Sequence, residues 1–225
     1  MSHLRIACNP LCWMNSDIPT LGSHIPVEQC LSEISMIGYA GVELEDPLRD
    51  ALQLRPHILR ERHLDLVAAW HGTRLLERSL AEEVEALKRH IDLIYPLGAR
   101  VINVAEVSHS VHREPGTGLS CRPRPTESQW DLLAERLDRL VELMEEAGMR
   151  SAYHHHMGCL VQTEEDIDSL MQRTERVELL LDTGHLFYAG GDALRVIEKH
   201  GARIRHVHAK NVRKGIVQRL LAEDA

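Results

Sequence analysis

Short apolar runs alternate along the whole chain with longer segments in which apolar residues recur every three or four positions. The first pattern is typical of buried strands and the second of amphipathic helices. We predict seven strands, at residues 4–8, 41–44, 64–69, 101–107, 150–154, 177–181 and 204–208. Because these runs are apolar on both faces and alternate with helices, they indicate a parallel sheet with right-handed crossovers.

Helix boundaries are marked by proline, capping and glycine signals. The start signals are Pro26, Ser79 with Glu82, Thr126 with Gln129, and Thr163, and the end signals are Gly38, Gly148 and Gly201. At Gly148 and Gly201 we expect a left-handed backbone that closes a helix.

Two architectures have alternating strands and helices of this kind, an open doubly wound sheet and a (β/α)8 TIM barrel. The open sheet normally has a glycine-rich turn after its first strand, and the segment CNPLCW at residues 8–13 has no glycine. We therefore predict a TIM barrel formed by a single domain over residues 1–225. Its eighth strand is expected to be missing, because the sequence ends shortly after the helix that follows strand seven.

Composition narrows the classes of partner. The 225 residues are 44% hydrophobic and 27% charged, which suits one barrel-sized core. A net charge of −8 leaves no basic stripe for a phosphate backbone, so we expect no nucleic-acid partner. No apolar run approaches the roughly 20 residues that cross a bilayer, and the first residues lack a signal pattern, so we expect a cytoplasmic protein without a membrane partner. Five cysteines without a CxxC pair argue against disulfides and a zinc knuckle.

Polar residues follow every predicted strand. In a TIM barrel the active site lies at the carboxyl ends of the strands. The residues placed there are Asn9, Glu43, Glu45, His71, Glu106, His154 to His156, Asp182, His185, His206, His208 and Lys210. Burying so many ionisable groups is costly unless they are paired or bind an ion, so a metal is the economical explanation. Ion pairs in the barrel mouth are the alternative for Glu43, Glu106 and Lys210.

Strand alternation sorts the histidines. His154 and His156 share one face and His155 takes the other, although a register slip of one residue would select His155. Neutral imidazoles with carboxylates suit a divalent cation such as Mn, Co, Fe or Zn rather than Ca. Asp182 in DTGH is also consistent with a plain helix cap. We expect core or loop roles for His24, His57, His63, His90, His109, His112 and His200.

Seven segments together match the pattern of one known family. They are NPLCWMNSDIPTLG, GVELE, LVAAWHGTRLLERS, INVAEVSHSVH, AYHHHMGCLVQTEEDIDSLM, LLLDTGHLFYAGGD and RHVHAKNVR. DTGH alone would be weak evidence for a family, but YHHHMG followed by LLLDTGHL and HVH is a specific combination of motifs. Over nearly its whole length the chain resembles the inosose dehydratases, which belong to the xylose isomerase-like TIM barrels.

The resemblance implies a divalent metal, manganese or cobalt above all, with Asp182, His208 and His154 as ligands. The last glutamate of the family's ligand set has no counterpart, and Asn211 replaces a family aspartate. His154, His156 and His185 are then the candidate acids and bases. The polyol pocket would be lined by Asn9, Trp13, Glu43, His71, Glu106, Lys210 and Arg213.

The implied reaction is loss of water from 2-keto-myo-inositol through a metal-stabilised enediolate, in inositol catabolism. A sugar or polyol isomerase or epimerase on the same barrel would share the metal and the enediolate and is the enzyme alternative. An inactive truncated binding module is the alternative from another class. The substrate class is a small polyol or ketose in each enzyme case. The sequence settles neither the metal nor the oligomeric state, and a homo-oligomer is left open.

Overall fold

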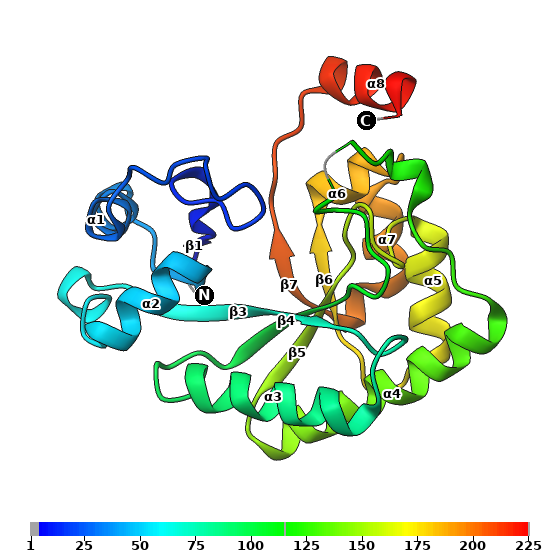
Figure 1. Ribbon diagram of the computed structural model, residues 1–225, viewed down its shortest axis with the longest axis horizontal. Helices are drawn as coiled ribbons and strands as arrows, with labels where there is room; N and C mark the ends of the chain where they lie inside the picture. The colour runs from blue at the N-terminus through cyan, green and yellow to red at the C-terminus, as the bar shows by residue number, and fades with distance from the viewer. Residues whose placement is uncertain (1–4, 115, 225) are drawn as a thin grey trace. The chain divides into compact units, whose positions relative to one another are not determined.

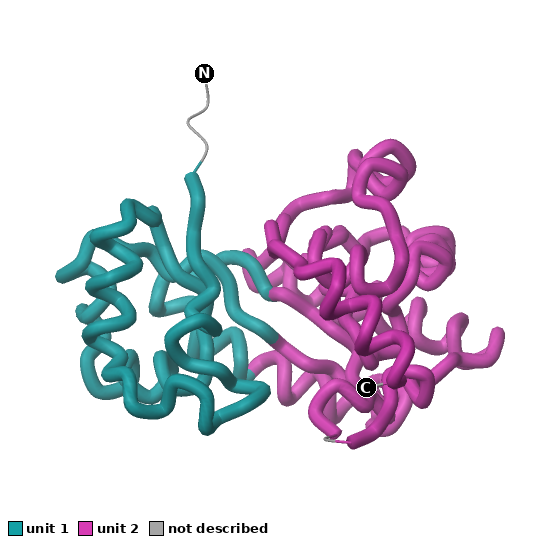
Figure 2. The backbone as a smooth tube through the Cα atoms, turned by 90° about the horizontal axis from the view of Figure 1, so that it is seen from above, with its two compact units in different colours: residues 1–70, 89–102 teal, residues 71–88, 103–225 magenta. Residues whose placement is uncertain are grey.

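The computed structural model describes residues 5–114 and 116–224 of the chain. It forms two compact units, residues 1–70 with 89–102 and residues 71–88 with 103–225 (Figure 2). Strand β3 (Asp65–Thr73), helix α3 (Leu80–Ile94) and strand β4 (Val101–Glu106) run from one unit into the other. The single-domain prediction is not decided by this division and stays a prediction.

The first unit holds the amino-terminal strands and helices. Its elements are β1 (Ala7–Cys8), η1 (Pro10–Cys12), α1 (Val27–Ile37), β2 (Gly41–Leu44), α2 (Asp46–Leu54) and η2 (Arg60–Arg62). β1 pairs with β2, and β2 with β3, in parallel. α1 starts after Pro26 and ends at Gly38, whose φ of 97° is left-handed, so both predicted boundaries are confirmed. Its buried face is formed by Cys30, Leu31 and Ile34.

The second unit holds most of the strands and helices. Its further elements are η3 (Leu119–Cys121), α4 (Glu127–Glu146), β5 (Arg150–His154), α5 (Glu164–Arg173), β6 (Leu179–Asp182), α6 (Thr183–Tyr188), α7 (Ala193–His200), η4 (Gly201–Arg203), β7 (Ile204–His208) and α8 (Lys214–Glu223). β5 pairs with β6, and β6 with β7, in parallel. Helices α4 and α5 pack against each other (Figure 1). Among the described helices, none has both the length and the apolar character of a membrane span.

The core of the second unit follows the predicted hydrophobic pattern. α4 buries the residues spaced along one face, Trp130, Leu133, Leu137, Leu140 and Met144. Such spacing places them on one side of a helix with 3.6 residues per turn. Every residue of β6 and all of β5 after its first residue are buried, as expected for parallel strands covered on both faces.

Strand order distinguishes the two architectures. The seven strands of the described chain are hydrogen-bonded in one sheet in the order β1 to β7. A doubly wound sheet reverses its strand order at a switch point, whereas a βα barrel places each strand next to its predecessor in the sequence. The barrel-type α/β fold is thus confirmed, with seven strands in the part of the chain that the structure describes.

Four sequence predictions need correction. Gly201 has φ of −53° because the 3-10 turn η4 starts there and continues the right-handed backbone. β6 begins at Leu179 rather than at residue 177, since the preceding backbone turns to bond Asp138 through the N–H groups of Glu175 and Arg176. β3 extends four residues beyond its predicted end at residue 69, to Thr73. Of the first predicted strand, residue 4 lies outside the described residues, and β1 comprises only Ala7 and Cys8.

The capping predictions are confirmed. Thr126 with Gln129 and Thr163 with Asp166 form complete capping boxes for α4 and α5. The hydroxyl of Ser79 accepts a hydrogen bond from the backbone N–H of Glu82 at 3.3 Å. The helix expected to end at Gly201 is α7, of eight residues, and Asp182 caps the six-residue α6. The pattern did not predict α2, which has only nine residues.

Candidate metal and catalytic site

Three neighbouring strands of the second unit end in candidate ligands. β5 ends at His154, β6 at Asp182 and β7 at His208. Asp182 is the register partner of His208, and His154 is the partner of Leu180, two residues before Asp182. Because parallel strands end at one edge of their sheet, the three side chains converge there.

The two carboxylate oxygens of Asp182 have different surroundings. Oδ1 accepts hydrogen bonds from the backbone N–H groups of Gly184 and His185, each at 2.9 Å, and so caps α6. Oδ2 is fully buried and accepts no well-oriented hydrogen bond within the described chain. The capping interaction therefore fixes the carboxylate so that its second oxygen faces the histidines.

His154, Asp182 and His208 form a compact triangle of donor atoms. His154 Nε2 lies 3.1 Å from His208 Nδ1 and 3.4 Å from Asp182 Oδ2, and His208 Nδ1 lies 3.4 Å from the same oxygen. Atoms that bind one cation at about 2.0–2.2 Å in tetrahedral or octahedral geometry lie about 2.8–3.6 Å apart. The triangle has the dimensions of one face of such a coordination sphere.

His185 is a fourth candidate ligand. One donor atom from each of His154, Asp182 and His185 lies within 4.8 Å of the other two, and all three residues are buried. His185 Nε2 is 3.8 Å from Asp182 Oδ2. Its ring also lies 3.9 Å, centroid to centroid, from the ring of His156.

Backbone carbonyls fix the tautomers of two histidines. His154 Nδ1 lies 2.8 Å from the carbonyl oxygen of His155, and His156 Nδ1 lies 2.8 Å from that of Met157. A carbonyl oxygen only accepts, so each Nδ1 must carry the proton. In the neutral ring the lone pair then lies on Nε2, so this nitrogen is the one suited to bind a cation or accept a proton; in His154 it lies 3.1 Å from His208 Nδ1.

Burial keeps these imidazoles neutral. It lowers the pKa of His154, and it holds the pKa of His156 and His185 well below the usual range. Burial also raises the pKa of Asp182, but the neighbouring His154 and His208 outweigh it and hold that pKa far below its usual value. Near neutral pH the cluster therefore presents one anionic oxygen and several neutral nitrogens.

Lys210 is the cation that the structure places in this cluster. Its Nζ lies 2.9 Å from Asp182 Oδ2 and 3.0 Å from His185 Nε2. The ion pair neutralises Asp182, which is the plain alternative to a metal. Two features nevertheless fit a divalent cation: the buried Oδ2 lacks a well-oriented donor among the described residues, and His154 Nε2 lies 3.4 Å from it. Imidazole and carboxylate donors without thiolate suit Mn or Co as well as Zn.

His155 has a separate structural role. Its Nε2 accepts a hydrogen bond from the backbone N–H of Asp182 at 3.1 Å, which links β5 to the end of β6. Burial lowers the pKa of His155 to about 3, so the ring stays a neutral acceptor. Its Nδ1 is buried and has no hydrogen-bond partner among the described residues. The alternation predicted for the three histidines thus matches the geometry, with His154 and His156 beside Asp182 and His185.

Residues that the sequence analysis did not propose for the site lie beside His156. The rings of His112 and His156 meet edge to face at 5.2 Å, and the hydroxyl of Ser110 contacts His112 Nδ1. Cys159 Sγ lies 3.6 Å from Ser110 Oγ and 3.8 Å from His112 Nδ1. A Cβ at Gly158 would lie 2.8 Å from the backbone nitrogen of His112, so the loop needs glycine there. The one sequence feature that could have indicated His112 as a site residue is its position in the loop after β4.

Two other residues of the second unit that were predicted to line the pocket are Glu106 and Arg213. The carboxylate of Glu106 is buried and accepts hydrogen bonds from the Thr73 hydroxyl at 2.8 Å and from the N–H groups of Leu75 and Ser108 at 2.9 and 3.0 Å. These contacts hold the loops after β3 and β4. Arg213 is exposed at the start of α8. Their predicted contacts with substrate stay predictions.

Of the remaining predicted pocket residues, Asn9 follows β1 and Glu43 lies in β2, whereas Trp13 follows η1, and His71 lies inside β3 rather than after it because that strand extends to Thr73. In the first unit, the Asn9 amide donates to Glu43 at 2.9 Å, and Trp13 Nε1 donates to Glu33 at 2.5 Å. At His71, the first residue of the second unit, burial lowers the pKa to about 4. For these residues too, a role in binding substrate stays a prediction.

Sequential parallel βα units, with ionisable groups at the carboxyl ends of the strands, define a barrel-type α/β protein with its site at that end. Comparison with known proteins refines this class. The chain belongs to the xylose isomerase-like TIM barrel family, whose model matches residues 31–220. This family assignment confirms the one made from the sequence motifs.

Two curated relatives show how close the relationship is. An inosose dehydratase of Geobacillus thermodenitrificans is 40% identical over 225 residues, which cover 99% of this chain and 76% of the relative. The rhizopine catabolism protein MocC of Rhizobium meliloti is 40% identical over 219 residues, or 97% of this chain and 67% of the relative. The chain is thus a member of an enzyme family.

Solved structures share the fold. The probable 3-DHS dehydratase AsbF of Bacillus anthracis superposes with a TM-score of 0.73 at 14% identity, covering 96% of this chain and 77% of that one. An L-ribulose 3-epimerase superposes with a TM-score of 0.65 at 20% identity, covering 92% of this chain and 69% of that one. At these identities the likeness concerns the fold alone.

Proposed function

We propose that the chain is a metal-dependent hydro-lyase that removes water from 2-keto-myo-inositol, an inosose, in inositol catabolism. The observation that carries the proposal is the triangle of His154, Asp182 and His208, in a chain 40% identical to an inosose dehydratase. A small polyol substrate and a cytoplasmic location belong to the same proposal.

The ligands would be Asp182 Oδ2, His154 Nε2 and His208 Nδ1, whose mutual distances suit one cation. A divalent ion such as Mn or Co would polarise the substrate carbonyl and an adjacent hydroxyl. His185 lies close enough to add a further nitrogen or to act on the substrate.

His156 is the best placed general base. Its Nδ1–H is held by the Met157 carbonyl, so Nε2 can accept the proton from the carbon next to the ketone. Burial holds the pKa of His156 well below the usual range, so the ring is neutral and its lone pair is on Nε2.

His185 with Lys210 is the proposed acid. Lys210 Nζ donates to His185 Nε2 at 3.0 Å, which connects an ammonium group to the imidazole beside His156. This pair would protonate the departing β-hydroxyl, so that water leaves and the enol product tautomerises to a trihydroxycyclohexane-1,2-dione. His154 then serves as a ligand rather than as an acid.

The test is turnover of 2-keto-myo-inositol with added Mn²⁺, followed by the ultraviolet absorbance of the conjugated product and by product mass. We expect a product lighter by one water. His156→Asn should lower kcat by about 10²–10⁴-fold and leave Mn²⁺ binding intact. The exposed His24 is the matched control, and His24→Gln should change neither quantity.

Two results would contradict the proposal. A product with unchanged mass would show that the proton returns to carbon, as in an isomerase or epimerase. A protein that neither retains Mn²⁺ nor turns over the ketone would indicate a binding module.

A further inference from the structure

The ammonium group of Lys210 contacts the same oxygen on which the proposed metal site depends. Its Nζ lies 2.9 Å from Asp182 Oδ2, and His154 Nε2 and His208 Nδ1 each lie 3.4 Å from that oxygen. The ammonium is close but poorly oriented, because the buried Oδ2 accepts no well-oriented hydrogen bond from the described residues. A lysine and two candidate ligands therefore converge on one buried carboxylate oxygen.

The fold holds Lys210 in this position through the first turn of α6. Thr183 Oγ1 accepts a hydrogen bond from the backbone N–H of Lys210 at 3.0 Å. A Cβ at Gly184 would lie 2.6 Å from the Cβ of Lys210, so the stem of the lysine can lie against α6 only if that position is glycine. Asp182 caps the same turn, so one local structure fixes both the carboxylate and the backbone of the lysine.

The ammonium group can nevertheless leave the cluster without unfolding of the chain. The side chain of Lys210 is 39% exposed, whereas that of Asp182 is 0% exposed. Its second contact, with His185 Nε2 at 3.0 Å, involves a ring outside the triangle of proposed ligands. A flexible four-carbon stem with this exposure lets the head group turn away from Oδ2 while the backbone stays in place.

Charge balance sets the ammonium group against a divalent cation. With neutral imidazoles, Asp182 is the one anion of the triangle, and Lys210 already neutralises it. A divalent ion at the triangle would add two positive charges close to the ammonium, so that three positive charges face one carboxylate. Even in water, a divalent ion and an ammonium about 4 Å apart repel each other enough to weaken binding by more than about tenfold. The two cations therefore disfavour each other at this oxygen.

We propose that Lys210 and the divalent cation compete for Asp182 Oδ2, so that the lysine limits how tightly the site binds metal. This inference rests on the metal-dependent function proposed above and concerns the regulation of the same site. Without metal, the ammonium keeps the buried carboxylate paired. Once displaced from Oδ2, it can keep its contact with His185, where the proposed reaction needs an acid.

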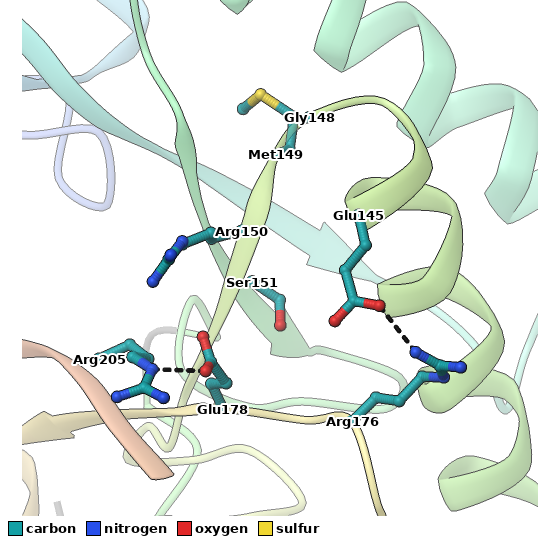
Figure 3. A pocket seen from close by; sticks show the side chains of 8 residues that line it. All are labelled: Glu145, Gly148, Met149, Arg150, Ser151, Arg176, Glu178 and Arg205. Atoms are coloured by element: carbon teal, nitrogen blue, oxygen red, sulfur yellow. Dashed lines mark hydrogen bonds and ion pairs between the residues drawn. The ribbon is translucent and has the colours of Figure 1, made fainter.

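An ion pair at the other end of β7 provides a matched control. Figure 3 shows Arg205 joined to Glu178, at 2.5 Å, beside a pocket that is also lined from α4 and β5. The two side chains are 45% and 26% exposed, so this pair should contribute little to stability. Arg205 lies three residues before His208 on the strand, or about 10 Å at 3.3 Å per residue. Arg205→Met therefore removes one paired cation away from the site.

The test measures Mn²⁺ binding by electron paramagnetic resonance, and thermal unfolding, on chains freed of metal with a chelator, at constant pH and ionic strength. We expect Lys210→Met to bind Mn²⁺ at least about tenfold more tightly than the unaltered chain. Without metal it should unfold about 4 °C lower or more, because the buried Asp182 loses its counter-ion. Lys210→Arg keeps the charge and should resemble the unaltered chain in both measurements. Arg205→Met should change Mn²⁺ affinity by less than about twofold.

Three results would overturn the proposal. The first is a Lys210→Met chain that binds Mn²⁺ no more tightly than the unaltered chain. The second is equal tightening in Arg205→Met or Lys210→Arg, which would show that the ammonium itself is not the competitor. The third concerns folding: if Lys210→Met does not fold without metal, saturating Mn²⁺ should restore its fold, and failure to do so contradicts competition.

These measurements use no substrate, so the two proposals can fail separately. A product other than the dehydrated ketone would refute the proposed function while tighter Mn²⁺ binding by Lys210→Met still supported the competition. Conversely, unchanged Mn²⁺ affinity in Lys210→Met, together with Mn²⁺-dependent loss of water from 2-keto-myo-inositol by the unaltered chain, would refute the competition alone.

Discussion

Asp182 joins the candidate metal site to the start of α6, and two substitutions separate the two roles. Asp182→Asn retains an amide oxygen that can accept the hydrogen bonds from Gly184 and His185, but it replaces the anionic Oδ2 with a neutral group. Asp182→Ala removes both oxygens. The two variants should therefore differ in stability and agree in losing the cation.

The expected losses of Mn²⁺ affinity and of stability follow from the two roles of Asp182. Loss of groups that merely orient metal ligands costs about 10–100-fold in affinity, so loss of an anionic ligand should cost at least about 100-fold, or roughly 2.7 kcal/mol. Removing an N-cap costs about 1 kcal/mol. We expect both variants to bind Mn²⁺ at least about 100-fold more weakly, and Asp182→Ala to be about 1 kcal/mol less stable than Asp182→Asn.

The assay combines electron paramagnetic resonance of free Mn²⁺ with urea unfolding of the metal-free protein. Asp192, which caps α7 by accepting a hydrogen bond from the N–H of Leu194, gives matched control substitutions. Asp192→Ala should lose stability without losing Mn²⁺ affinity. Undiminished Mn²⁺ binding by Asp182→Asn would refute the ligand assignment, and equal stability of the two Asp182 variants would refute the capping argument.

Three further predictions concern stability and reactivity. Thr126→Ala removes the capping box of α4 and should lower the free energy of unfolding by about 1 kcal/mol in urea titrations. Burial raises the pKa of Asp168, but hydrogen bonds from the lysine and histidine of α7 outweigh burial and lower that pKa. The ionised Asp168 therefore stabilises the protein above about pH 4, and this stabilisation is lost as the pH falls further. Asp168→Asn should be less stable than the unaltered chain at pH 7, and the difference in stability should shrink in acid. The exposed Cys12 and Cys121 should react first with a thiol reagent, whereas burial raises the pKa of Cys30 to about 12 and should protect it until the protein unfolds.

The parts of the fold that the sequence predicted are those with local causes. Capping boxes at Thr126 and Thr163, and the glycine after α1, are read from a few adjacent residues and lie where the pattern placed them. Gly201 shows the limit of such signals. A glycine can end a helix or continue into a 3-10 turn, and only the packing of the following segment decides between them.

The sequence allowed us to predict which strand ends carry the site, but not how its side chains contact one another. Alternation along β5 separated His155 from its neighbours, and the strand ends singled out Asp182 and His208. Distances between side chains cannot be read from a sequence, so the contacts of Lys210 with Asp182 and of His112 with His156 could not be predicted. These contacts depend on loops that return to the site from separate strands.

The three consecutive histidines divide their work between chemistry and scaffolding, with consequences for anyone transplanting this centre into another barrel. A graft that copied only the outer two would omit the ring that ties the backbone of one strand to the end of the next. Lysine or arginine in the middle place could donate but never accept, and would push the recipient strands apart. The smallest transferable unit is therefore the whole triplet together with the amide of the aspartate it holds.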